Sequence, residues 1–222
     1  MVRPKKSTSQ FTERAPDKII EVAIDLFSRY GFKGTSIRQI AKASGLTTST
    51  LYYYFGTKGG LLAAIEAHTI KPMMLELRKV YALELPALDR LALLLKTHLT
   101  YIGTHQKESR IFFLNEEFLP TSNKDFNKKH QREIFIMYRA EVERVLFAVG
   151  RKKDSTVATF CTFGVMMWLL RWYRSEGRFS MEDVINKIIQ YVLCAITGDV
   201  SQSDTTTSSA GMASQREYAS PP

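Results

Sequence analysis

Large apolar side chains recur at every third or fourth position along most of this chain of 222 residues, which is the spacing of amphipathic helices. No stretch shows the alternating apolar and polar residues, joined by short turns, that strands require. The composition, with 45% hydrophobic and 24% charged residues, is that of an ordinary globular protein. We therefore predict an all-α fold.

Glycines and hydroxyl residues divide the first third of the chain into short predicted helices. The first helix ends at Gly31, where the backbone can adopt left-handed angles. The second begins at Thr35 or Ser36, either of which can cap it, and ends at Gly45. A third helix follows at 47–54, and a fourth begins near residue 58. Further helices are predicted at 88–102, 111–119, 135–149, 157–170 and 185–196.

The second and third helices are short and are joined by a single glycine turn at residues 43–46. In a helix-turn-helix, the first helix lies across the DNA backbone and the second enters the major groove. The third helix contains only one plain core residue, Leu51. Its hydroxyls, from Thr47 onward, can reach base edges or phosphate oxygens. Lys58 begins the next helix, where both the ammonium and the helix dipole favour phosphate.

The net charge of +9 is concentrated near the start of the chain. Residues 1–65 carry ten basic and four acidic side chains, although they make up under a third of the sequence. A basic excess fits either nucleic acid or an anionic membrane surface. Its concentration beside the short paired helices favours an N-terminal unit that faces a polyanion.

The sequence offers no arrangement of residues typical of an enzyme or a metal site. The four histidines are scattered, and the two cysteines are too few for a zinc finger or a disulfide framework. The segment 56–60 is rich in glycine but lacks the spacing of a phosphate-binding loop. We expect no cofactor, no metal and no catalytic residues. With neither an apolar leader nor a membrane-spanning run, we expect a cytoplasmic protein that does not contact membranes.

The residues between 20 and 62 resemble a known DNA-binding domain as an ordered set. They include Tyr-Gly-Phe at 30–32, Thr-Ser-Ile at 35–37, Ser-Gly-Leu at 44–46 and Leu-Tyr-Tyr-Tyr-Phe at 51–55, followed by Lys58. This pattern resembles the TetR family of bacterial transcriptional regulators. The chain departs from it with Tyr54 in place of a histidine and Gly59 in place of an acidic residue.

The resemblance implies a homodimer that binds double-stranded operator DNA, usually as a repressor, and releases it when a small molecule enters the C-terminal body. By position it implies DNA contacts from the second, third and fourth helices. With Thr47 included for its hydroxyl, the expected DNA-binding residues are Arg38, Thr47, Thr48, Ser49, Thr50, Tyr52, Tyr53 and Lys58.

These inferences divide the chain into four parts. A basic flexible arm covers residues 1–14, and a three-helix helix-turn-helix DNA-binding domain covers 15–60. A helical ligand-binding and dimerisation domain covers 61–198. The last part, 199–222, is rich in serine and threonine with few large apolar residues, so we expect it to be disordered.

The helix predicted at 157–170 is apolar almost all round but too short to span a membrane. We therefore interpret it as a helix buried on several sides, as a dimer interface demands. The resemblance implies that the last two helices form a four-helix bundle between subunits. The residues expected in this bundle are Phe160, Phe163, Met167, Ile185, Ile189 and Val192.

Both tryptophans and three arginines lie in the segment 168–180, which resembles the acyl-CoA-responsive branch of the family. Arginines beside an aromatic, apolar pocket suit the phosphates and acyl tail of such a ligand. The candidate ligand residues are Trp168, Arg171, Trp172 and Arg174. Alternatively, the arginines are helix-end charges and the tryptophans are core residues.

Two other functions stay open at this point. The chain can be a DNA-binding regulator without a small-molecule effector, or a sensor of a cationic or other hydrophobic ligand. Glu116 and Glu117 would line the pocket of a cation sensor, although a solvated helix face is their simpler interpretation.

Overall fold

The computed structural model describes residues 15–152 and 154–198, and these fold into helices with no strand among them. The predicted arm (1–14) and tail (199–222) lie outside the described residues. Within the described ranges, no helix is long and apolar enough to cross a membrane. The all-α prediction is confirmed for this part of the chain.

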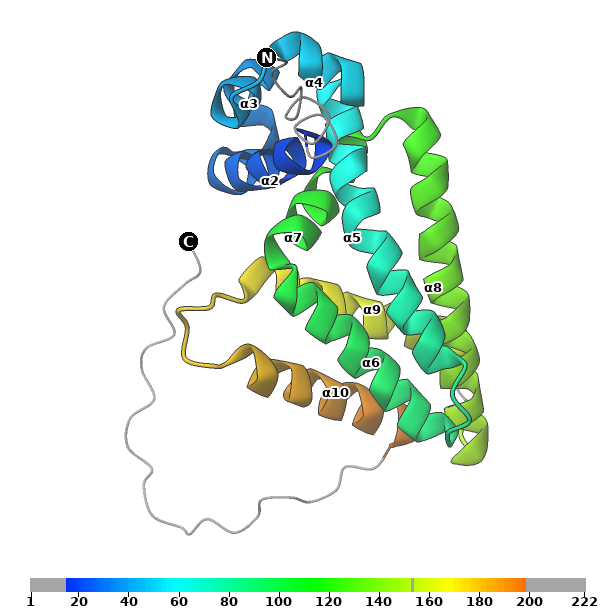
Figure 1. Ribbon diagram of the computed structural model, residues 1–222. Coiled ribbons are helices and arrows are strands. Elements are labelled where there is room, and N and C mark those ends of the chain that lie inside the picture. Colours follow the sequence, from blue (N-terminus) through cyan, green and yellow to red (C-terminus); the bar gives the residue numbers. More distant parts are fainter. Residues whose placement is uncertain (1–14, 153, 199–222) are drawn as a thin grey trace, which may run out of the picture.

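The N-terminal unit contains α2 (Ala15–Gly34), α3 (Ile37–Ser44) and α4 (Thr48–Phe55). Figure 1 shows them gathered at one end of the molecule. The backbone of α2 is kinked at Gly31, whose φ is 74°. Apolar side chains from the three helices form one buried cluster, which is completed by Leu61, Leu62 and Ile65 from the start of α5 (Lys58–Tyr81).

Helix α5 continues without a break from the N-terminal unit into the body, and it passes through Pro72. The predicted domain division at residue 60 therefore falls inside the first turn of one helix. Ile111 and Leu119, much later in the chain, also belong to the N-terminal cluster. The two units thus share a helix and a packed junction.

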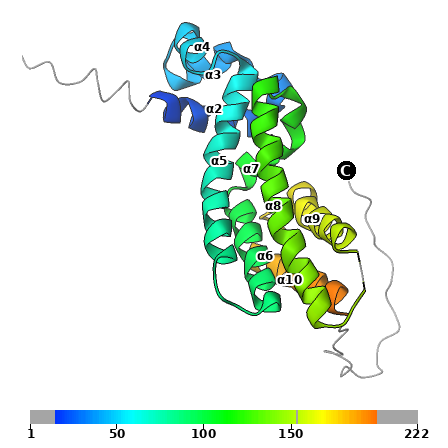
Figure 2. The same ribbon diagram turned by 90° about the vertical axis from the view of Figure 1, so that its right-hand side faces the viewer.

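The body consists of longer helices around a second apolar cluster. Its remaining elements are α6 (Ala87–Thr104), α7 (Gln106–Asn115), the 3-10 helix η1 (Glu116–Phe118), α8 (Thr121–Ala148), α9 (Ser155–Trp172) and α10 (Met181–Thr197). Figures 1 and 2 show α5 and α8 running down from the N-terminal unit, with α9 and α10 on one side of the body. Helix α8 begins well before Phe135, the first apolar residue used to predict it. The prediction began too late because the first turns of the helix are largely polar and show no apolar spacing.

A buried carboxylate joins two helices of the body. Glu141 on α8 is fully buried, and its Oε2 lies 3.0 Å from Nε of Arg90 on α6. Arg144, one turn further along α8, pairs with the other carboxylate oxygen. Because a lone buried charge would be costly, the two arginines offset the burial of the Glu141 carboxylate.

Candidate DNA interface and ligand pocket

The turn between α3 and α4 is determined by local hydrogen bonds. Ser36 caps α3 and forms a capping box with Gln39. Gly45 ends α3 with a φ of 69°, a left-handed angle that favours glycine. Thr47 then caps α4 by accepting a hydrogen bond from the Thr50 backbone N–H. These caps fix where both short helices begin and end, as the sequence predicted.

Helix α4 buries one side and exposes the other. Leu51 is its buried residue, whereas Tyr52 and Tyr53 are 54% and 83% exposed. Ser49 is exposed on the same side as the tyrosines. The result is an exposed surface of hydroxyl groups on a helix of two turns.

The other predicted DNA-binding residues are placed less uniformly. Arg38 on α3 is exposed, and Thr48 is half-buried. The hydroxyls of Thr47 and Thr50 hydrogen-bond each other at 2.9 Å, so each already has one partner within the helix cap. The hydroxyl groups of Ser49, Tyr52 and Tyr53 are therefore the most accessible on α4.

Lys58 has an internal role that the sequence did not reveal. Its ammonium donates hydrogen bonds to the carbonyl oxygens of Phe32 (2.7 Å) and Thr35 (2.9 Å), and it lies 4.3 Å from the centre of the Phe32 ring. Partial burial lowers the pKa of Lys58 below its ordinary value. Since an ammonium has three donors, one N–H is left for a phosphate. Lys58 thus ties the start of α5 to the end of α2.

The body contains a pocket of about 740 Å³ between α5, α6, α7, α8 and α9. Its interior is lined by apolar side chains, among them Ile70, Met73, Ile102, Ile134, Met167 and Leu170. A volume of this size is typical of small-molecule sites.

Exposed cations border this pocket. Lys128 and Arg132 lie one turn apart on α8, and Arg171 lies on α9. Glu116 is the acidic group among the lining residues, and its carboxylate accepts a hydrogen bond of 3.3 Å from Gln131. The border is therefore mainly positive, as an anionic ligand group would require.

The four predicted ligand residues are not brought together. Arg171 lines the pocket, whereas Trp168 and Trp172 line a separate apolar groove between α9 and α10. The guanidinium of Arg174 folds back onto the carbonyl oxygens of Arg171 and Tyr173. The pocket lies between α9 and the helices α5 to α8, whereas the groove lies between α9 and α10, so the side chains at the end of α9 divide between two sets of neighbours.

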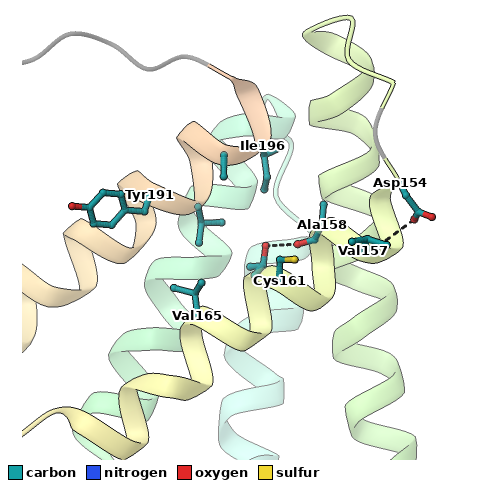
Figure 3. A pocket seen from close by; sticks show the side chains of 10 residues that line it. Asp154, Val157, Ala158, Cys161, Val165, Tyr191 and Ile196 are labelled. Atoms are coloured by element: carbon teal, nitrogen blue, oxygen red, sulfur yellow. Dashed lines mark hydrogen bonds between the residues drawn. The ribbon is translucent and has the colours of Figure 1, made fainter. Parts of the chain in front are cut away.

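The outer face of α9 and α10 carries two apolar grooves of about 570 and 540 Å³. Figure 3 shows Val157, Cys161 and Val165 of α9 opposite Tyr191 and Ile196 of α10 around one of them. Trp168 and Tyr191 are 61% and 70% exposed. In the single chain this face of the segment 157–170 is open, so its predicted burial on several sides depends on a partner and stays a prediction.

Two residues expected between subunits belong to the core of the chain itself. Ile185 and Val192 are buried in the cluster of the body, and Ile189 packs against that cluster. Phe163 and Met167 line the pocket of the body. The face that is open to a partner is instead the one that carries Trp168 and Tyr191.

The sequence reasoning missed most of the residues that line the pocket. Asn127, Lys128, Gln131 and Arg132 all lie in the polar first half of α8, before the apolar stripe that marked the helix. Their spacing of three and four positions was a detectable signal, but only the fold shows that this face is turned toward α9. Among the described residues, no group of histidine, cysteine and acidic side chains could hold a metal ion.

Comparison with known proteins agrees with this architecture. Residues 84–196 match the family model described as tetracyclin repressor-like, C-terminal domain, and residues 19–65 match that of bacterial regulatory proteins, tetR family. The probable transcriptional regulator YttP of Bacillus subtilis is 52% identical over 46 residues, which cover 21% of this chain and 22% of YttP.

Two similarities extend over most of the chain. The transcriptional repressor KstR2 of Rhodococcus jostii is 24% identical over 201 residues, covering 86% of this chain and 94% of that protein. The crystal structure of AibR in complex with isovaleryl coenzyme A and operator DNA has a TM-score of 0.71 at 22% identity, covering 80% of this chain and 97% of AibR. The matched family models span the helix-turn-helix and the body, and the chain belongs to the TetR family of DNA-binding transcriptional regulators, not to an enzyme family.

Proposed function

We propose that this protein is a homodimeric transcriptional repressor that leaves its operator when an acyl-CoA occupies the pocket of the body. The observation that carries the proposal is the apolar pocket with Lys128, Arg132 and Arg171 on its border. An apolar interior suits an acyl chain, and the three cations suit the phosphates of coenzyme A. The likeness to AibR, crystallised with isovaleryl coenzyme A, and to the repressor KstR2 supports the choice.

In this proposal α4 enters the major groove and α3 lies against the backbone. Tyr52, Tyr53 and Ser49 reach base edges from their exposed face, and Arg38 contacts phosphate. The complete proposed contact set is Arg38, Thr47, Thr48, Ser49, Thr50, Tyr52, Tyr53 and Lys58.

The dimer forms through the outer face of α9 and α10. Its exposed aromatic and aliphatic side chains surround two apolar grooves, and burying them against a second copy removes this surface from water. A twofold axis through this face repeats the same contacts on both copies and sets two recognition helices at a fixed spacing.

Release requires a physical path from the pocket to the DNA-binding end. Phe112 on α7 lines the pocket and also packs against the N-terminal cluster. A few residues later, Phe118 of η1 stacks on Phe32 with ring centres 5.1 Å apart. We infer that a ligand that displaces α7 also displaces the N-terminal unit. The ligand must favour the released conformer, because equal binding to both would shift nothing.

The test is an operator-release assay, with operator DNA selected from a random library by the purified protein. We expect a short-chain acyl-CoA to release the DNA and the matching free acid to leave it bound. Arg132→Ala should weaken release, whereas Arg139→Ala, which removes an exposed arginine of the same helix outside the pocket, should not.

A cationic effector is the second candidate, because Glu116 lines the pocket. Release by cationic dyes and not by any CoA thioester would favour this candidate and contradict the acyl-CoA proposal. In that case, Glu116→Gln should weaken release and Arg132→Ala should not.

A further inference from the structure

Asn127 places a buried polar atom in the wall of the pocket. It lies in the second turn of α8 and is 5% exposed. Its Oδ1 has no hydrogen-bond partner among the described residues. A buried acceptor without a partner is unfavourable, so a group that donates to this oxygen gains more there than it would in water.

Glu66 is a second buried polar group without a partner near the same pocket. It is 1% exposed, and neither carboxylate oxygen has a hydrogen-bond partner among the described residues. It lies one turn before Thr69 and Ile70, which line the pocket on the same face of α5. Burial and then repulsion from Glu116 raise its pKa to about 7. Glu116, the source of this repulsion, is one of the residues that line the pocket.

The deeper polar groups of the pocket are already paired. The Nδ1 atom of His98 lies 3.3 Å from the hydroxyl of Tyr138, which donates to the carbonyl oxygen of Leu94 at 2.9 Å. Burial lowers the pKa of His98 to about 4, so its ring is neutral at physiological pH. The unpaired groups lie instead in the third turn of α5 and the second turn of α8.

We propose that the part of the effector inside the pocket carries a hydroxyl group, and that this hydroxyl donates a hydrogen bond to Asn127 with Glu66 as a neighbouring polar group. The inference rests on the proposed function, since it specifies the acyl part of the ligand. A plain alkyl chain would cover the Asn127 oxygen without donating a hydrogen bond to it. A hydroxylated chain pairs it, and the expected preference is about 10- to 100-fold in dissociation constant.

The experiment measures binding to the full-length protein by calorimetry with matched ligands. One pair is butyryl-CoA and 3-hydroxybutyryl-CoA, and a CoA-free pair is decanoic acid and 3-hydroxydecanoic acid. The variant Asn127→Leu replaces the amide with an apolar group of similar size. The control Arg139→Ala changes an exposed residue of α8 that lies outside the pocket.

We expect the wild type and Arg139→Ala to prefer the hydroxylated member, and Asn127→Leu to lose the preference. Thermal melting of the free protein gives a second readout: Asn127→Leu should melt at a higher temperature, because it removes an unpaired buried acceptor. A lower melting temperature would mean that the amide is already satisfied, which contradicts the inference.

The two ligand pairs separate the failure of this inference from that of the acyl-CoA proposal. If only the free acids bind and the hydroxylated one binds more tightly, the acyl-CoA proposal fails and the inference stands. If the thioesters bind without discrimination, the acyl-CoA proposal stands and the inference is overturned. Tighter binding of 4-aminobutyryl-CoA than of the hydroxylated thioester, or no binding by either pair, also overturns it.

Discussion

Helices α4 and α9 both carry aromatic side chains that point away from the core, but their neighbours differ. On α4, Tyr52 and Tyr53 lie among serine and threonine hydroxyls. On α9, Trp168 and Trp172 lie beside valine, glycine and the apolar side chains of α10. The first surface offers hydrogen bonds to a polar partner, whereas the second offers apolar area to another protein surface. The neighbours of an exposed aromatic residue thus indicate its partner better than its exposure does.

A charge on the apolar face of α9 should produce the largest effect. In Trp168→Glu, the apolar indole is lost and a carboxylate would be buried against the second subunit, and this desolvation costs several kcal/mol even though Lys187 lines the same groove. Because Trp168 is exposed in the single chain, the variant should still fold. Sedimentation should show monomers, and operator binding should be lost. Leu75→Glu, an exposed apolar residue of α5, is the control and should remain dimeric.

Removal of a tyrosine from α4 tests whether this helix contacts DNA bases. Tyr53→Ala should weaken operator binding by about 1–3 kcal/mol, because a base-edge contact is lost, and should weaken random DNA much less. Tyr30→Ala removes another exposed tyrosine, from α2, and should leave both affinities unchanged. Equal losses on operator and random DNA in a fluorescence titration would mean that Tyr53 contacts only the backbone.

The DNA-binding end was the more predictable of the two surfaces because its signals are local. Ser36, Gly45 and Thr47 act on backbone groups within a few residues, so their caps can be identified from sequence alone. The pocket depends on which faces of α5, α7, α8 and α9 converge, which no local spacing determines. Helix α9 illustrates the limit: its apolar residues divide among the core, the pocket and the outer groove.

Lys58 has both an internal structural role and a proposed contact with phosphate, and its replacement separates the two. Lys58→Ala removes two hydrogen bonds, one to Phe32 in α2 and one to Thr35 just after it, and should lower the free energy of unfolding by about 1–3 kcal/mol in urea titrations. If its remaining N–H also contacts phosphate, the dependence of operator affinity on log salt should become shallower by about one unit. Loss of stability with an unchanged salt slope would restrict Lys58 to the internal role.

The raised pKa of Glu66 leads us to expect a specific dependence of stability on pH. With its pKa raised from 4.5 to about 7, Glu66 holds a proton in the folded state at pH values where the unfolded chain has released it. Its contribution is therefore fully present below about pH 4.5 and is lost as pH rises through about 7. Glu66→Gln should be more stable than the wild type at pH 8, by up to a few kcal/mol, and nearly equal to it at pH 4.5.

His98 contributes to the same profile with the opposite sign. Its pKa is lowered from 6.5 to about 4, so the unfolded chain binds a proton first and stability falls as pH drops below about 6.5. Glu66→Gln removes the opposing contribution of Glu66, and urea titrations should show stability rising from pH 4.5 to 7. A flat profile in this variant would contradict the assignment to His98.

The smallest effect should come from the two arginines that end α9. Arg171 lines the pocket, whereas the guanidinium of Arg174 is occupied by the carbonyl oxygens at the end of the helix. Arg171→Ala should therefore raise the acyl-CoA concentration needed for operator release by several-fold, as expected for one exposed ionic contact. Arg174→Ala should leave that concentration unchanged. Equal effects in the release assay would mean that the CoA phosphates extend past the end of α9 and also contact Arg174. The pocket and the outer face of this helix would then be closer to each other in the dimer than in the single chain.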